Sequence, residues 1–230
     1  MQMTKRAKEN MKLAPEGALP AEEAIKTLKK FKAPKFDQTV EVVMHLGIDT
    51  KQADQQIRGS VSLPKGIGKS KRVIAFCRED QRAAAMEAGA IKAGGEELVE
   101  EIEKGWMDFD VAVSTPDMMR VISKLGRVLG PKGLMPSPKA GTVTQDVVGA
   151  VKEYGAGKVE YRADKSGNVH AVVGKMSFSE GDLVENLNHF IGTIEKAKPS
   201  AVRGTYVKKI TVSGTMTPGV RVHYAAAVVE

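Results

Sequence analysis

The stretch Gly126-Arg-Val-Leu-Gly-Pro-Lys-Gly-Leu-Met-Pro-Ser-Pro-Lys-Ala-Gly-Thr-Val143 contains four glycines and three prolines. Glycine adopts backbone angles that are closed to other residues, and proline is excluded from helix interiors. The stretch therefore cannot run as one regular element. It is nevertheless too apolar for a disordered linker, because four of its side chains favour burial: Val128, Leu129, Leu134 and Met135. These features predict a packed loop with a fixed path.

The charge of this loop and of the residues before it is one-sided. No acidic residue occurs between Met118 and Gln145, whereas five basic residues do: Arg120, Lys124, Arg127, Lys132 and Lys139. Concentrated positive charge favours a polyanionic partner. On composition alone, a surface loop with incidental lysines is an equally good interpretation.

Several runs together resemble one family, the L-one family of ribosomal proteins, in its bacterial form. The signature-like run is Leu129-Gly-Pro-Lys-Gly-Leu-Met-Pro-Ser-Pro-Lys-Ala-Gly-Thr-Val143. The other matching runs, in chain order, are Lys35-Phe-Asp-Gln-Thr-Val-Glu41, Arg58-Gly-Ser-Val-Ser-Leu-Pro64, Gly105-Trp-Met-Asp-Phe-Asp110, Asp164-Lys-Ser-Gly167 and Thr215-Met216. The resemblance spans nearly the whole chain, from about residue 7 to residue 224.

The resemblance implies a structural protein of the large ribosomal subunit. Its family members bind large-subunit rRNA in the mobile exit-side stalk and contact deacylated tRNA leaving the exit site. In bacteria they also repress translation of their own operon mRNA, whose leader mimics the rRNA site. The expected partners are therefore rRNA, exit-site tRNA, the mRNA leader and the ribosome. Off the ribosome, the protein is expected to be a monomer.

The net charge and the isoelectric point of the chain also favour a polyanionic partner. The chain has 230 residues, a formal net charge of +7 and a pI near 9.3. Its single cysteine, Cys77, excludes an internal disulfide framework and lies in an apolar run that predicts a buried thiol. No segment approaches the ~20 apolar residues of a membrane span, and the N-terminus lacks a signal-peptide core. These features predict a reducing, cytoplasmic setting without membrane attachment.

Periodicity predicts two kinds of architecture. Residues 1–18 indicate a polar, partly helical arm, residues 21–31 a helix, and residues 39–48 and 57–63 strands. From residue 72 to residue 154 short apolar strands alternate with helices, one of them over residues 116–125, which predicts a parallel sheet. From residue 159 the strand period returns, with a hairpin at Asp164–Asn168 and a long helix capped by Ser179.

The fold class that follows is mixed, α/β and α+β, in two domains. A discontinuous α+β RNA-binding domain is expected from residues 1–66 and 159–230, and residues 67–158 form an inserted Rossmann-like α/β domain with a parallel sheet. The discontinuous domain carries a net charge of +6 and the inserted one +1. The discontinuous domain is therefore the better candidate for the main nucleic-acid contact.

Enzymatic chemistry finds little support in the residues. Gly68-Lys69-Ser70 ends like a phosphate loop, but the required earlier glycine is replaced by Leu63. The dinucleotide fingerprint is absent, and the four histidines lack metal-ligand spacing. Asp108 and Asp110 are more typical of turn chemistry than of a catalytic pair. We expect no catalytic residue, metal or cofactor; the alternative is a nucleotide- or cofactor-dependent enzyme that uses the α/β domain.

Candidate RNA contacts come mainly from the resemblance. From the residues alone, Phe36 is better interpreted as core and Glu41 as part of a solvated strand face. The resemblance instead implies rRNA and mRNA contacts at Lys35, Phe36, Thr39, Glu41, Thr215, Met216 and Thr217, and more weakly at Lys165 and Ser166. The family usually has glycine where this chain has Thr217, so we expect that side chain to hinder close approach of the RNA. Arg127, Lys132 and Lys139 are left available to tRNA or a second rRNA segment.

Overall fold

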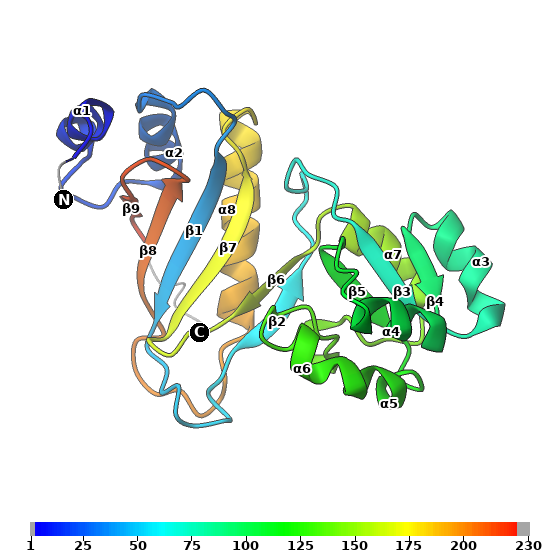
Figure 1. The fold of residues 1–230 in the computed structure, drawn as a ribbon. Helices are drawn as coiled ribbons and strands as arrows, with labels where there is room; N and C mark the ends of the chain where they lie inside the picture. Colours follow the sequence, from blue (N-terminus) through cyan, green and yellow to red (C-terminus); the bar gives the residue numbers. More distant parts are fainter. Residues whose placement is uncertain (1–2, 225–230) are drawn as a thin grey trace. The chain divides into compact units, whose positions relative to one another are not determined.

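The computed structural model of the protein describes residues 3–224 and divides into two compact units (Figure 1). The split unit comprises the chain up to residue 68 and again from residue 159. The inserted unit comprises residues 69–158. The split unit extends to residue 68, two residues beyond the expected boundary at residue 66, and the chain returns to it at Val159.

The split unit contains three helices and six strands among the described residues. They are α1 (Lys5–Leu13), α2 (Ala21–Lys30), β1 (Thr39–Leu46), β2 (Arg58–Val61), β6 (Val159–Arg162), β7 (Asn168–Lys175), α8 (Glu180–Lys196), β8 (Val207–Gly214) and β9 (Val220–Val222). Four of the strands form an antiparallel sheet in the order β7-β1-β8-β9. The other two, β2 and β6, pair as an antiparallel ribbon.

One face of the four-stranded sheet is covered and the other is open. Val40, Val42 and Met44 on β1 are fully buried in a core that α2 and α8 complete (Figure 1). The residues between them alternate to the opposite face, where Glu41 is exposed and Thr39 and Val43 are only half-buried. The period of two in the sequence thus corresponds to one packed and one accessible face.

The inserted unit has a parallel three-stranded sheet in the order β4-β3-β5. Its elements are β3 (Val73–Phe76), α3 (Glu79–Glu87), β4 (Lys92–Gly94), α4 (Glu96–Glu103), β5 (Val111–Ser114), α5 (Met119–Ile122), the 3-10 turn η1 (Ser123–Leu125), α6 (Gly126–Leu129), the 3-10 turn η2 (Pro138–Ala140) and α7 (Val147–Gly155). Val73 and Ala75 belong to one core layer, Ile74 and Phe76 to the other. The predicted mixed fold with a parallel sheet is confirmed.

The loop from Gly126 to Val143 is held by specific contacts. Thr142 Oγ1 accepts a hydrogen bond from the Ser137 amide at 2.8 Å, and the Tyr154 hydroxyl donates to the Ala140 carbonyl at 2.6 Å. One expectation for this region was wrong, and a second, for the residues before it, was right only in part. Val128 is 37% exposed, because it lies on the outer side of α6 while Leu129 packs inward. The helix predicted over residues 116–125 is only α5 followed by η1.

Cys77 and Asp110 are both held within the inserted unit. Cys77 is buried, and burial raises the pKa of its thiol. The Asp110 carboxylate accepts hydrogen bonds from the Arg72 amide at 3.0 Å and from Arg72 Nε at 3.3 Å, and these bonds lower the Asp110 pKa. Asp110 therefore ties β5 to the residue before β3. No helix within residues 3–224 is long and apolar enough to cross a membrane.

Candidate nucleic-acid interface

The start of β1 and the turn after β8 are hydrogen-bonded to each other, although they are far apart in sequence. The Thr39 amide donates to Thr215 Oγ1 at 3.1 Å, and the Thr215 amide donates to the Thr39 carbonyl at 3.1 Å. Thr39 Oγ1 also accepts from Lys175 Nζ on β7 at 2.8 Å. The two segments that the resemblance singled out are therefore one site at one end of the sheet.

Two large apolar side chains stand exposed at this site. Phe36 is 52% exposed and Met216 is 54% exposed. The interpretation of Phe36 as core, drawn from the residues alone, was wrong, because residues 35–37, which precede β1, are all exposed. Exposed apolar groups that are held beside polar ones are suited to packing on a base or ribose.

Gln38 fixes Met216 in this position, and sequence reasoning missed it. The Gln38 side chain is 1% exposed, and its Oε1 accepts from the Met216 amide at 2.9 Å. The Gln38 carbonyl accepts from the Met176 amide at 2.9 Å, which connects the same point to the end of β7. The only available signal was its place inside the Lys35–Glu41 run, because a buried glutamine bonded to remote backbone leaves no local pattern.

Thr217 is directed into its own turn. Its amide donates to the Gly214 carbonyl at 3.1 Å, and its Oγ1 accepts from the Gly214 amide at 2.8 Å. Within residues 3–224 only glycines have positive φ, so the backbone at Thr217 does not require glycine. The hydroxyl thus closes the turn that presents Met216, a role that the sequence did not indicate.

Lys35 and Glu41 flank this site. Both side chains are exposed, and Glu41 follows a shift in register between β1 and β7 at Val40. The shift lies beside the junction with Thr215. A carboxylate at such a position can accept hydrogen bonds from 2′-hydroxyls or base amines, and the ammonium group of Lys35 can bind phosphate.

Lys165 and Ser166 lie at the opposite end of β1. The hairpin is closed by Asp164, whose carboxylate accepts from the Ser166 and Asn168 amides, each at 2.8 Å, and these bonds lower the Asp164 pKa. The Leu46 amide donates to the Gly167 carbonyl at 2.9 Å, so the hairpin borders the last residue of β1. At ~3.3 Å per residue, this end is about 23 Å from Thr39. A hollow of about 420 Å³ lies on the open face near the hairpin, lined by Val43, His45, Asn168, Lys209 and Thr211.

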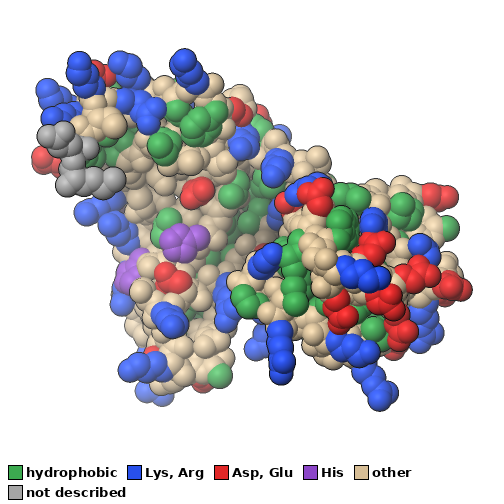
Figure 2. Space-filling view, in the orientation of Figure 1, with side chains coloured by type: hydrophobic (Ala, Val, Ile, Leu, Met, Phe, Trp, Pro, Cys, Tyr) green, Lys and Arg blue, Asp and Glu red, His purple; other side chains and the backbone are tan. Residues whose placement is uncertain are grey.

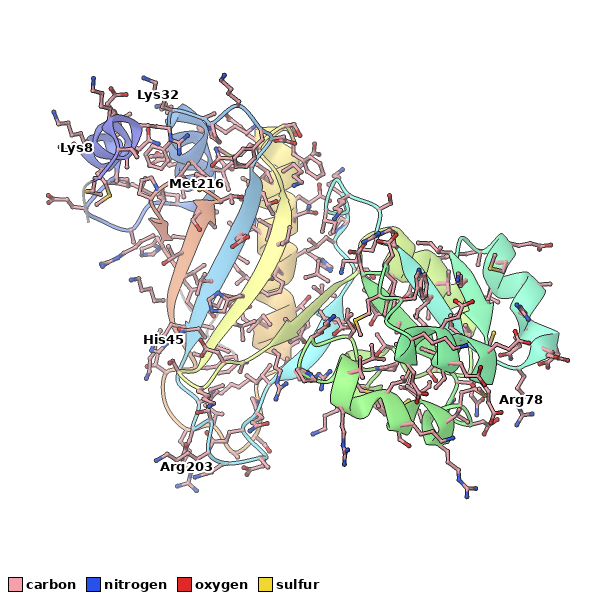
Figure 3. The ribbon with its side chains drawn as sticks, in the orientation of Figure 1. Lys8, Lys32, His45, Arg78, Arg203 and Met216 are labelled. Carbon is pink, nitrogen blue, oxygen red and sulfur yellow. The ribbon has the colours of Figure 1, made fainter. Side chains whose placement is uncertain are left out.

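Figure 3 shows this separation, with Met216 at one end of the sheet and His45 near the other. The structure therefore brings Thr39 together with the turn of Thr215, Met216 and Thr217, three residues after the exposed Phe36, and leaves Lys165 and Ser166 apart. We call Lys35, Phe36, Thr39, Glu41, Thr215 and Met216 the recognition cluster.

The remaining candidates belong to the inserted unit. Arg127 on α6, Lys132 in the following turn and Lys139 in η2 are all exposed. The packed path of the loop fixes the backbone that carries them. Among the described residues, no group of three His, Cys, Asp or Glu side chains is arranged to hold a metal ion.

A comparison with known protein families decides the assignment. Residues 28–218 match the model of the Ribosomal protein L1p/L10e family. The chain belongs to this family. As a member of the L1p/L10e family it is a ribosomal protein of the large subunit that binds rRNA, and it acts in the cytoplasm as part of the ribosome. The match contains the whole recognition cluster and the loop from Gly126 to Val143, whereas α1 lies before its first residue.

Proposed function

We propose that the recognition cluster of the split unit makes the main rRNA contact of this L1p/L10e family member. The observation that carries the proposal is the junction between Thr39 and Thr215, which holds Phe36 and Met216 exposed beside the open end of the sheet. Because Gln38 and Thr217 fix the turn before RNA arrives, little ordering cost remains for binding.

Each member of the cluster has a chemical role in this proposal. Phe36 and Met216 pack against bases or riboses, and the Lys35 ammonium binds phosphate. Glu41 accepts hydrogen bonds from 2′-hydroxyls or base amines. This combination selects a folded RNA, because 2′-hydroxyls and splayed bases are absent from regular duplex DNA.

We propose two further activities, one for the recognition cluster and one for the basic loop of the inserted unit. A folded leader of the operon mRNA that presents the same shape would compete for the recognition cluster, and binding there would repress translation. The basic loop of the inserted unit, with Arg127, Lys132 and Lys139, would contact exit-site tRNA and help its release. The exposure of these three side chains supports that second role.

Crosslinking in cells followed by sequencing of the bound RNA tests the rRNA assignment. We expect reads concentrated in one segment of large-subunit rRNA, with additional reads in the operon leader and in tRNA. Reads spread away from rRNA would overturn the proposal. The enzyme alternative predicts instead a small molecule that remains with the protein after high salt has removed RNA.

A companion titration separates specific recognition from general charge attraction. The rRNA segment and a DNA duplex of equal length are titrated at several salt concentrations. We expect tighter binding of the RNA throughout, with both affinities falling as salt rises. Equal affinities would contradict recognition of folded RNA.

A further inference from the structure

Helix α1 carries a row of lysines on its outer face. Lys5, Lys8 and Lys12 follow the spacing i, i+3, i+7, which places them on one side of an α-helix. All three are exposed, and none has an acidic partner within residues 3–224. We call these three residues the lysine face.

The opposite side of α1 is docked on the split unit. Asn10 is fully buried, its Oδ1 accepts from the Lys32 amide at 2.9 Å, and its Nδ2 donates to the Lys32 carbonyl at 3.3 Å. Glu9, which lies next to Lys5 and Lys12 on the helix surface, forms a salt bridge of 3.1 Å with the Lys32 ammonium, and both side chains are more than half exposed. Thr4 caps the first turn of the helix. The lysine face is therefore carried by a helix with a fixed attachment.

This attachment places α1 near the recognition cluster. Lys32 is four residues before Phe36, so the two backbones are separated by at most about 14 Å. Figure 3 shows Lys8, Lys32 and Met216 at the same end of the split unit. In Figure 2, blue side chains gather over this end, where α1 and α2 lie.

The charge of this end is not balanced by the protein. Residues 1–35 contain 9 Lys and Arg residues against 4 Asp and Glu residues, which accounts for most of the charge excess of the split unit.

We propose that the lysine face of α1 binds the phosphates of the RNA strand that continues beyond the recognition cluster. The proposal rests on the function proposed above and extends its site to a helix that precedes the family match. Contacts of this kind add affinity and fix the orientation of the RNA without reading its sequence. A merely solvated helix face is the competing interpretation, and the salt dependence distinguishes the two.

The test compares two variants of the full chain that lose the same charge. The first is Lys5→Gln/Lys8→Gln/Lys12→Gln, in which glutamine preserves helix propensity. The control is Lys152→Gln/Lys196→Gln/Lys198→Gln, which removes three exposed lysines outside α1 and outside the recognition cluster. Binding of the rRNA segment is measured from about 50 to about 200 mM salt, a range over which phosphate contacts dominate changes in affinity.

We expect the slope of log affinity against log salt to become shallower by about two to three in the α1 variant, because each phosphate contact contributes somewhat less than one. The control is expected to keep the slope of the parent. If both variants have equal slopes while Met216→Ala still weakens binding, the proposed phosphate contacts of the lysine face would be overturned. The proposed function of the recognition cluster would then still stand. A parent chain that does not bind the rRNA segment would refute both.

A second variant tests the docking rather than the charge. Asn10→Ala keeps every lysine but removes both hydrogen bonds to Lys32. We expect the affinity for the rRNA segment to fall several-fold at constant salt. Unchanged affinity would show that a loosely attached helix serves equally well, and would overturn the role of the fixed attachment.

Discussion

Replacing Thr217 by glycine tests whether the turn that presents Met216 is held by the threonine hydroxyl. The substitution removes the 2.8 Å hydrogen bond from the Gly214 amide, which is worth about 1 kcal/mol. Glycine also increases the freedom of the unbound chain, at a further cost of about 0.5–1 kcal/mol. Together, these two changes lower the stability of the ordered turn, relative to disordered conformations, by about 1.5–2 kcal/mol.

Part of that loss should appear in RNA binding, because a loosened turn must be ordered again on the RNA. We expect Thr217→Gly to weaken binding of the rRNA segment by up to about tenfold, which corresponds to ~1.4 kcal/mol. Fluorescence anisotropy with a labelled RNA at fixed salt measures the change. Amide hydrogen exchange at Gly214 should become faster in the free variant, because its acceptor has been removed.

Thr217→Ser is the matched control, since it keeps the hydroxyl and is expected to bind within about twofold of the parent. The sequence alone suggests the opposite result for glycine, namely unchanged or tighter binding through closer approach of the backbone. Tighter binding by Thr217→Gly, or equal weakening by glycine and serine, would refute the hydrogen bond as the feature that holds the turn.

Three other changes follow from the same contacts. Met216→Ala should weaken binding of the rRNA segment by ~1–2 kcal/mol through lost apolar packing, and parent-like affinity would remove Met216 from the interface. Asn186→Ala should lower the free energy of unfolding, measured in urea, by ~3 kcal/mol. The buried side-chain amide of Asn186 forms hydrogen bonds with three backbone groups, namely the Lys65 amide and the carbonyls of Gly66 and Val173. A loss below ~1 kcal/mol would contradict this role. Because the folded-state pKa of Asp110 is lowered, its contribution to stability is present above about pH 4 and is lost as pH falls through that lowered pKa. The difference in Tm between the parent and Asp110→Asn should therefore shrink below pH 4, and a constant difference would contradict the ion pair with Arg72.

The sheet of the split unit could be predicted because its pattern is local. Val40, Val42 and Met44 alternate with polar residues, and the core they enter is completed by helices with their own apolar stripes. The hairpin at Asp164 was also predictable, since aspartate and glycine form such turns from their own side-chain and backbone chemistry. The helix expected over residues 116–125 is present from Met119 to Leu125, as α5 followed by η1, so only its first three residues were misplaced.

The organisation of the candidate site was less accessible from sequence. The contact between Thr39 and Thr215 joins segments separated by 176 residues, and the resemblance suggested the pair without its geometry. Gln38 and Asn10 are buried polar residues whose partners are backbone groups elsewhere in the fold. Local periodicity carries no information about such partners, so their roles appear only in the structure.

The central claim is that the split unit carries the main rRNA contact. The direct test uses a protein in which residues 1–68 are joined to residues 159–230 through a short Gly/Ser linker. This joined protein, the parent chain and the excised fragment of residues 69–158 are each titrated with the rRNA segment. The account predicts that the joined protein folds and binds within about tenfold of the parent, or ~1.4 kcal/mol, while the excised fragment folds but binds weakly. A folded joined protein that has lost the RNA, together with an excised fragment that retains it, would contradict the account.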